Sequence, residues 1–180
     1  MVPLYILGLI GRNGPQHGYQ IRKSIEEQLQ DFTQIKPPTI YYHLARMEAD
    51  GLLTARGERP GARPEKTVYA LTERGQEAFS GMLMEALRFD YRPSFPLDAA
   101  FFFSDCVDPA ALREGLGEHA RNLRGAIEAI EAHQQESLRS VPPEHAASAG
   151  AIFRHHLMHY RAELAWAEEA LDALRTEESL

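Results

Sequence analysis

The spacing of apolar residues along the first half of the chain predicts three short helices. Residues 3–10 form a mainly apolar run that ends at a glycine- and proline-containing turn sequence, residues 11–15. Apolar side chains then recur every four positions through residues 21–29, which is typical of an amphipathic helix. A third helix is expected over residues 37–51, because its two leading prolines suit a first turn and its closing glycine suits a stop.

Two short strand-like runs follow, over residues 52–56 and 67–71, and they flank a loop rich in glycine, proline and arginine. This pattern predicts a β-hairpin with a long tip. Thr72 is then placed to cap a fourth helix that runs to about Phe89. Three helices, a hairpin and a further helix in this order predict a winged helix-turn-helix domain over residues 1–90, with the hairpin as its wing.

The second half of the chain predicts a pair of long helices. A phenylalanine-rich segment, residues 95–103, suggests a short and heavily buried helix, and Asp108-Pro109 then opens a helix that runs to about residue 138. Pro142-Pro143 breaks this helix before a last one over residues 144–175. In both long helices the apolar positions alternate in steps of four and three, as in an antiparallel coiled coil.

A hairpin of two amphipathic helices leaves apolar surface uncovered, and a second copy of the chain is its usual partner. Residues 91–180 are therefore predicted to form a helical dimerisation domain in a mainly α protein. The residues expected to carry dimerisation are Leu116, Leu123, Ile127, Ile130, Phe153, Leu157, Tyr160, Leu164, Leu171 and Leu174.

Charge is divided unevenly between these two parts. The net charge is −7, but residues 1–80 hold 10 lysine or arginine residues against 9 acidic ones, whereas residues 81–180 hold 9 against 17. The acidity is confined to the second part, which indicates a solvated acidic surface or a different partner.

Composition narrows the cellular setting. No apolar run approaches the roughly 18 residues of a membrane span, and the start lacks the basic segment of a secretory signal. Cys106 is the only cysteine, so an intrachain disulfide framework is excluded. These features favour a cytoplasmic protein without a membrane partner.

Polar and aromatic side chains gather on the face of the third predicted helix opposite its buried stripe. Thr39, Tyr42, His43 and Arg46 share this face, and a helix of this size fits the major groove of DNA. Arginine can grip guanine with two hydrogen bonds, while Thr39 and Tyr41 are placed to bond phosphates. Positive charge near the helix and the wing comes from Lys36, Arg56, Arg59, Arg63 and Lys66. By themselves these residues are consistent with binding to double-stranded DNA, with protein contacts through a winged helix, and with an ordinary polar surface.

Three stretches within the first 75 residues, taken in order, resemble the PadR family of bacterial regulators. They are residues 7–21, 39–53 and 63–75, with the motifs Gly14-Pro15-Gln16-His17-Gly18-Tyr19, Tyr41-Tyr42-His43-Leu44 and Arg63-Pro64-Glu65-Lys66. The long helical second half is similar to the subfamily with a large dimerisation domain.

The resemblance implies a homodimeric repressor that binds a pseudo-palindromic operator in double-stranded DNA and is released by a small aromatic effector. The DNA contacts that it implies are Thr39, Tyr41, Tyr42 and Arg46 in the major groove, Arg63 and Lys66 on the wing, and His17 and Tyr19 at phosphate. The aromatic residues available for an effector cavity are Phe95, Phe101, Phe102, Phe103, Tyr160 and Trp166, although such residues more often form core. We therefore assign no effector-binding residue.

Other chemistry has weaker support in the sequence. His155 and His159 lie at i and i+4, a spacing that suits a divalent metal ion, and His119 or His133 could supply a third ligand. The alternative is that both are ordinary exposed histidines beside the coiled-coil seam. Cys106 has carboxylates nearby, which disfavour a reactive thiol. The sequence lacks a phosphate-binding glycine loop and a nucleophile elbow, so we expect no enzyme, no cofactor and no assigned metal ligand.

Overall fold

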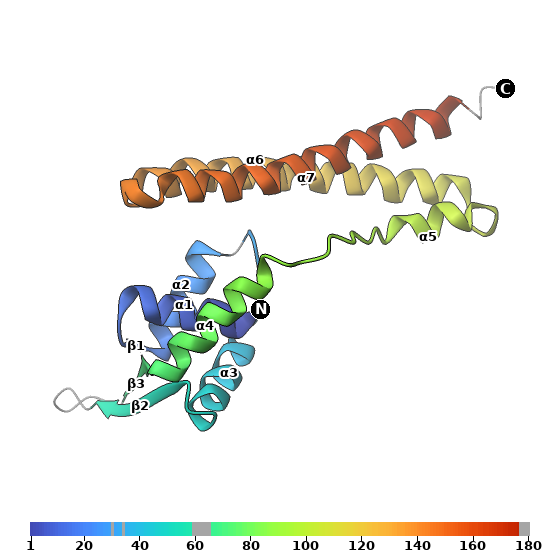
Figure 1. Cartoon of the computed structure of the whole chain (residues 1–180). Helices are drawn as coiled ribbons and strands as arrows, with labels where there is room; N and C mark the ends of the chain where they lie inside the picture. Colours follow the sequence, from blue (N-terminus) through green and yellow to red (C-terminus); the bar gives the residue numbers. More distant parts are fainter. Residues whose placement is uncertain (30, 34, 59–65, 177–180) are drawn as a thin grey trace. The chain divides into compact units, whose positions relative to one another are not determined.

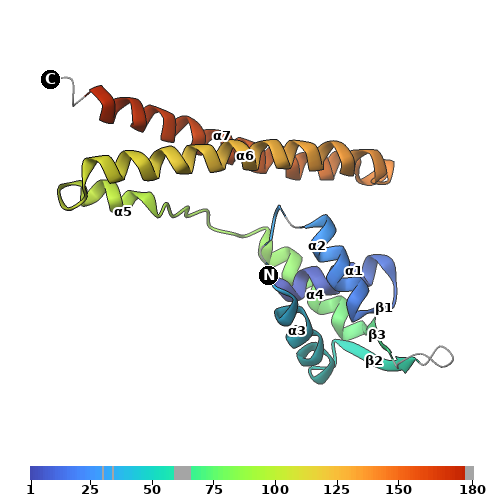
Figure 2. The ribbon, with the colours of Figure 1, turned by 180° about the vertical axis from the view of Figure 1, so that it is seen from behind.

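The computed structural model describes residues 1–29, 31–33, 35–58 and 66–176, and the chain divides into two compact units, Met1–Tyr91 and Arg92–Leu180. Figures 1 and 2 show the first unit as a cluster of short helices with a small sheet, and the second as two long helices preceded by a short one. No described helix is long and apolar enough to cross a bilayer. The expected fold class, mainly helical with a small wing, is confirmed.

The first unit follows the predicted order of helices and hairpin, with one strand added. Its elements are α1 (Val2–Asn13), β1 (Gln16–His17), α2 (Gly18–Gln28), α3 (Pro37–Ala49), β2 (Leu53–Glu58), β3 (Lys66–Leu71) and α4 (Glu73–Ala86). The three strands form an antiparallel sheet in the order β1–β3–β2, and β2 and β3 make the predicted hairpin. The sequence does not predict β1, because a run of two residues is too short to show alternation. It pairs with β3 so that Gln16 lies opposite Tyr69, which ties the start of α2 to the wing.

The apolar stripes of α1, α2 and α3 meet in one core. Its fully buried members include Ile6, Leu7, Ile10, Ile21, Ile25, Ile40 and Leu44. Burying a side chain of this size contributes roughly 1.5–3 kcal/mol. The core therefore fixes which face of α3 points inward and which face is presented to solvent.

A cap and a close contact fix the start of α4. The Thr72 hydroxyl accepts a hydrogen bond from the Gly75 amide at 3.0 Å and donates one to the Gly51 carbonyl at 2.8 Å. A Cβ atom at Gly75 would lie 2.1 Å from the Leu52 carbonyl oxygen, so a side chain at this position would clash with the backbone. The cap expected at Thr72 is confirmed, but α4 ends earlier than expected, at Ala86.

The second unit is built on a helical hairpin. It contains α5 (Leu97–Phe102), a 3₁₀ turn (Ser104–Cys106), α6 (Pro109–Ser140) and α7 (Pro143–Thr176). Asp108 caps α6 by accepting a hydrogen bond from the Ala110 amide at 3.1 Å. Both ribbon views show α6 and α7 side by side and antiparallel (Figures 1 and 2).

The seam between α6 and α7 uses most of the residues that the sequence assigns to dimerisation. Leu116, Ala120, Leu123 and Ala167 are buried in one cluster of this seam, and Tyr160, Leu164, Leu171 and Leu174 pack around them. Ile130, Phe153 and Leu157 are also buried. These residues hold the two helices of one chain together, and their contact with a second copy stays a prediction.

Ion pairs also join α6 to α7. They are Arg124–Glu168 at 2.5 Å and Arg161–Glu131 at 2.6 Å, and a hydrogen bond between His119 Nε2 and Glu163 Oε1 at 3.2 Å lies beside them. Because these side chains are a quarter to a half exposed or more, each pair contributes at most about 1 kcal/mol. The apolar seam therefore dominates the stability of the hairpin.

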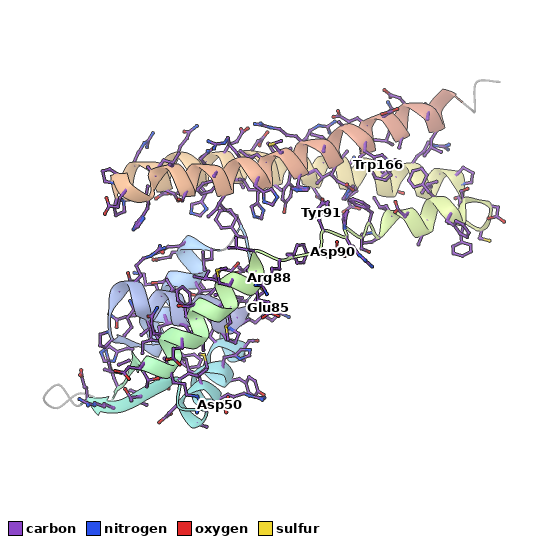
Figure 3. All side chains as sticks on the ribbon, viewed as in Figure 1. Asp50, Glu85, Arg88, Asp90, Tyr91 and Trp166 are labelled. Carbon is purple, nitrogen blue, oxygen red and sulfur yellow. The ribbon has the colours of Figure 1, made fainter. Side chains whose placement is uncertain are left out.

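The phenylalanine-rich segment is less buried than its composition suggests. α5 has no buried residue, and Phe102 is 80% exposed. A helix of one and a half turns can turn only one side toward the hairpin, and that side carries Leu97 and Phe101. Phe101 lies edge-on to Trp166, which is labelled in Figure 3, at 5.5 Å between ring centroids. The expectation of a heavily buried helix is wrong, because no residue of α5 is buried and Phe95, Phe102 and Phe103 are all exposed, with Phe102 and Phe103 in contact with each other.

Candidate nucleic-acid interface

The orientation of α3 follows from its own sequence. Ile40, Leu44 and Met47 are at most 3% exposed and lock one side of the helix into the core. Pro37 and Pro38 occupy the first turn and carry no N–H group. The next amide, that of Thr39, already donates to the Lys36 carbonyl at 3.0 Å. Residues 37–39 therefore offer no free backbone N–H group, and only the side chains of this turn can donate hydrogen bonds to a partner.

The outward side of α3 presents the aromatic and basic residues expected from the sequence. Tyr41 and Tyr42 are 45% and 58% exposed, and the Arg46 side chain is 65% exposed. The His43 ring is half-buried and packs edge-on against Tyr42, with 5.3 Å between ring centroids. These side chains form a continuous polar and aromatic surface along the helix.

Arg46 is held along the helix by two neighbours. Its Nη1 group donates a hydrogen bond to the Tyr42 hydroxyl at 3.2 Å, and its Nε atom lies 3.8 Å from the Asp50 carboxylate. The hydrogen bond to Tyr42 raises the pKa of Arg46 above its ordinary value, and the charge of Asp50 acts in the same direction. Asp50 ends the helix, as Figure 3 shows. The guanidinium is thus fully charged and exposed, and only weak contacts with solvent-exposed groups hold it in place.

A hollow of about 680 Å³ opens where α2, α3 and the wing meet. We call it the His17 hollow, and its lining residues are His17, Gly18, Tyr19, Gln20, Tyr41, Lys66, Thr67 and Tyr69. It brings together four residues that the sequence assigns to DNA contact, His17, Tyr19, Tyr41 and Lys66, from separate parts of the chain. An imidazole, phenolic hydroxyls and an ammonium group are all able to donate hydrogen bonds to an anion such as phosphate.

Two buried polar atoms of adjacent residues, one of which lines the His17 hollow, lack a hydrogen-bond partner in the described part of the chain. Among the described residues, His17 Nδ1 and Gln16 Oε1 are buried without a hydrogen bond. The His17 backbone amide, by contrast, donates to the Gln20 side chain at 2.9 Å. A buried polar group without a partner is costly, so a bound polar group or water that reached these atoms would be favoured.

Close packing places Tyr41 at the wall of the His17 hollow. A Cβ atom at Gly18 would lie 3.0 Å from the Tyr41 ring, so glycine is what lets the phenol lie against the start of α2. Beside Tyr19, which also lines the hollow, the Arg22 guanidinium lies 5.0 Å from the centre of the Tyr19 ring and is paired with Glu26 at 2.6 Å. Both tyrosines are thereby oriented by neighbouring residues, of which the sequence indicates Gly18 but not Arg22.

Tyr69 is the main residue of the His17 hollow that sequence reasoning missed. It lies on β3 opposite Gln16, and burial raises the pKa of its phenol above the ordinary value, with a smaller contribution from Glu48. Its position in a strand-like run was visible in the sequence. Its neighbours were not, because they depend on the pairing of β3 with the short strand β1.

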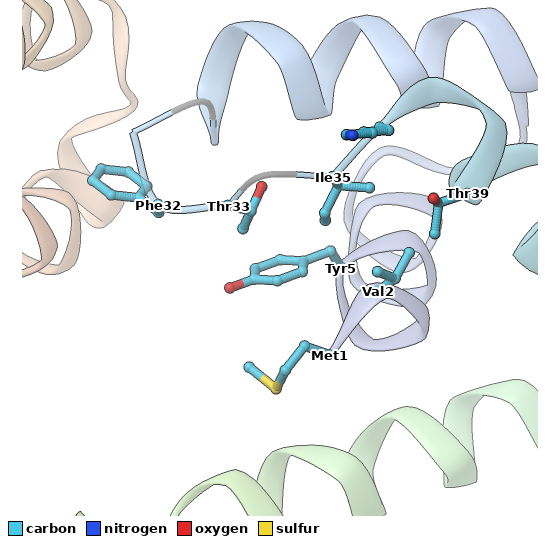
Figure 4. A pocket seen from close by; sticks show the side chains of 8 residues that line it. Met1, Val2, Tyr5, Phe32, Thr33, Ile35 and Thr39 are labelled. Atoms are coloured by element: carbon cyan, nitrogen blue, oxygen red, sulfur yellow. The ribbon is translucent and has the colours of Figure 1, made fainter. Parts of the chain in front are cut away.

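Lys36 and Thr39 line a different hollow. Its volume is about 440 Å³, and its other lining residues are Met1, Val2, Tyr5, Phe32, Thr33 and Ile35. Figure 4 shows the start of α1 facing the segment that leads into α3 across this space. Of the remaining predicted contacts, Arg56 is exposed on β2, and Arg63, like Arg59, lies outside the described residues.

The structure does not assemble the three-ligand metal site that the histidines suggested. His119 pairs with Glu163 at 3.2 Å, and the His133 ring packs edge-on against Phe153. Within the described part of the chain, no three or more histidine, cysteine, aspartate or glutamate side chains are arranged to hold a metal ion. Cys106 is exposed in the 3₁₀ turn.

Comparison with known proteins matches both parts of the chain to families of regulators. Residues 6–81 match the model of the transcriptional regulator PadR-like family, and residues 101–175 match the model of the virulence activator alpha C-terminal region. Together the two matches cover the winged helix and the helical hairpin.

Relatives resemble the chain over nearly its full length. The negative transcriptional regulator PadR of Bacillus subtilis (strain 168) is 24% identical over 155 residues, which are 85% of this chain and 82% of the relative. Its crystal structure in complex with operator DNA has a TM-score of 0.78 and 20% identity, with 96% of each chain covered, and it has also been solved with p-coumaric acid.

A second similar structure is that of the Vibrio cholerae virulence activator AphA, with a TM-score of 0.80 and 19% identity. It covers 98% of this chain and 99% of its own. At these identities the structural likeness establishes the fold, and the family model matches the unit that carries the His17 hollow. The chain is therefore similar to the PadR-like transcriptional regulators, whose family model matches residues 6–81 and whose fold it shares over nearly its full length.

Proposed function

We propose that the chain is a cytoplasmic repressor that binds a pseudo-palindromic operator in double-stranded DNA as a homodimer, and that a small aromatic effector releases it. Its family is one of regulators rather than enzymes. The His17 hollow is the main support for this proposal. Four predicted DNA contacts, which come from three separate stretches of the sequence, line this one concave surface beside α3.

Binding to the DNA backbone would use the His17 hollow. Lys66 supplies positive charge, and the hydroxyl groups of Tyr19 and Tyr41 supply neutral donors, a combination that suits a phosphate group. Arg63 would extend the contact along the wing. Such contacts position a protein on the duplex without reading its sequence.

Base readout would come from the exposed side of α3. Tyr42, His43 and Arg46 lie along this side, and arginine prefers the two acceptors on the major-groove edge of guanine. Arg46 would have to leave Tyr42 and Asp50 to reach a base. Since both contacts are exposed, the exchange costs little.

The second unit would supply the dimer. A regulator with two-fold symmetry reads two half-sites about one helical turn, roughly 34–36 Å, apart, which is why its operator is pseudo-palindromic. The net charge of −8 over residues 81–180 supports a role in dimerisation rather than in DNA binding, because an acidic surface is repelled by DNA.

Repression and release by an effector are supported by one relative. PadR is named as a negative regulator and has been solved with p-coumaric acid, whereas AphA is named as an activator. A small aromatic acid is therefore the first effector class to test on this chain.

The test is a binding titration with labelled duplexes from the protein's own promoter region, at two salt concentrations. Arg46→Ala should lose roughly 1–3 kcal/mol of binding free energy at one or two base positions. Lys66→Ala should weaken binding to every duplex alike and reduce the salt slope by about one. Arg121→Ala, which removes an exposed positive charge from α6, is the matched control and should bind as the wild type does.

The proposed function would be wrong if Arg46→Ala and Lys66→Ala both bound these duplexes as the wild type does. Weak binding with no dependence on salt would also count against it, because a dimer that displaces phosphate counterions must lose affinity as salt rises. Such a result would favour a winged helix that contacts protein instead.

A further inference from the structure

Two histidines on α7 lie within reach of a single metal ion. His155 and His159 are both exposed, and their Nε2 atoms are 3.2 Å apart. Their rings meet nearly at right angles, with 4.8 Å between centroids and 87° between planes. The i, i+4 spacing on a helix makes this approach possible without strain in the backbone.

The distance between the two nitrogens matches that of a metal chelate. Imidazole nitrogens bind zinc at about 2.0–2.1 Å, so two of them at angles between square-planar and tetrahedral lie roughly 2.8–3.4 Å apart. The observed 3.2 Å falls in this interval. We propose that His155 and His159 chelate one divalent transition-metal ion through their Nε2 atoms.

The ligands point to a class of metal. Neutral imidazole suits copper, nickel and zinc, whereas magnesium and calcium prefer oxygen ligands. Among these ions Cu²⁺ should bind most tightly, because affinities for nitrogen ligands rise along the first transition row to copper. With two protein ligands in the described part of the chain, water completes the coordination sphere, and the ion exchanges readily.

Forming the chelate requires one proton to move and the two exposed rings to turn so that both Nε2 atoms face the ion. Without metal, one Nε2–H group donates a hydrogen bond to the other Nε2 atom. When a metal ion binds, the donating ring shifts its proton to Nδ1, and both Nε2 lone pairs then face the ion. The hydrogen bond that is given up is exposed to water, so its loss costs little.

The neighbouring His156 provides an internal control. Its ring centroid lies 5.7 Å from that of His155, at 76°, and it sits on the next face of the helix, where it is half-buried. The proposal therefore assigns it no role in binding the ion. A single substitution at this position removes a histidine of the same helix and leaves the pair intact.

The experiment is calorimetric titration of the full-length, tag-free chain with Cu²⁺, Zn²⁺ and Mg²⁺, for the wild type and the variants His155→Gln, His159→Gln and His156→Gln. The wild type should bind one Cu²⁺ per chain and Zn²⁺ more weakly, and Mg²⁺ should not bind. Joining two ligands on one rigid helix raises affinity by about 10²–10⁴-fold, so His155→Gln and His159→Gln should each lose at least about 100-fold. His156→Gln should bind Cu²⁺ as the wild type does.

Three results would overturn the proposal. They are an unchanged Cu²⁺ affinity in His155→Gln and His159→Gln, an equal loss in His156→Gln, and Mg²⁺ binding as tight as that of Zn²⁺. Circular dichroism checks that each variant keeps its helix content, which exposed glutamine residues on a helix should preserve. The outcome does not depend on DNA binding, because the histidine pair and the His17 hollow lie in different units of the chain.

Discussion

Replacing Gly75 by alanine should destabilise the first unit through a contact that cannot relax by a side-chain rotation. The added Cβ atom would lie 2.1 Å from the Leu52 carbonyl oxygen and 2.8 Å from the Leu71 side chain. Cβ atoms in proteins essentially never lie closer than 3.0 Å to such a neighbour, so α4 or the chain at Leu52 must move by roughly 1 Å. The same short stretch accepts the hydrogen bond from Thr72, which opposes such a movement.

The size of the effect follows from two opposing contributions. Overpacking of this kind costs about 1–3 kcal/mol or more, while alanine improves helix propensity over glycine by about 1 kcal/mol. Because the atom in the way belongs to the backbone, the cost of overpacking lies at the upper end of this range. The net loss of unfolding free energy is therefore about 2 kcal/mol. In a unit of this size that loss lowers the melting temperature by about 10 °C.

Gly81 supplies the matched control, because it lies on the same helix with no atom within 4 Å of its Cβ position. Gly81→Ala should therefore stabilise α4 by up to about 1 kcal/mol. Urea and thermal unfolding followed by circular dichroism, at equal protein concentration, measure both variants. If Gly75→Ala melts at or above the wild-type temperature, the close contact between α4 and Leu52 is wrong.

Three further results are expected. Gly18→Ala should push the Tyr41 ring aside and lower the affinity for operator DNA, with a change in stability within about 1 kcal/mol, and wild-type affinity would contradict the packing at the His17 hollow. Leu116→Ala should cost roughly 2–5 kcal/mol in thermal unfolding because Leu116 is 1% exposed in the seam, whereas Leu138→Ala, at a 38% exposed position, should cost far less. Burial raises the pKa of Tyr69, so above about pH 10 the folded state keeps a phenol proton that the unfolded chain loses. The free energy of unfolding is therefore unaffected by this group below about pH 10 and falls as the pH rises above it. Tyr69→Phe should flatten the fall of unfolding free energy with rising pH in that range, and an unchanged slope in urea titrations would refute the assignment.

The elements that the sequence predicts well are those that begin or end at a residue with a clear local preference. Thr72 and Asp108 both cap helices where expected, through hydrogen bonds to the Gly75 and Ala110 amides. Prolines open α3 and α6, and Gly51, with φ at 71°, closes α3 in the left-handed region. These preferences act over one or two turns of chain, so one sequence is enough to reveal them.

The features that the sequence does not predict depend on contacts between distant segments. β1 exists because Gln16 pairs with Tyr69, and two residues carry no period of their own. The composition of residues 95–103 indicates apolar character but not whether the chain supplies a surface to cover Phe102. The separation of Thr39 from the His17 hollow depends on how the chain enters α3, a feature set by tertiary packing rather than by spacing.

The two prolines at the start of α3 limit which of its groups can contact DNA. Because Pro37 and Pro38 lack N–H groups and the Thr39 amide is already bonded, the helix cannot grip a phosphate through its own backbone. Under the proposed function, recognition would depend on side chains such as Tyr42 and Arg46, which are exposed and lie outside the core. Substitutions at these exposed positions would then change operator preference at little cost in folding stability, because surface substitutions usually change stability by no more than about 0.5 kcal/mol.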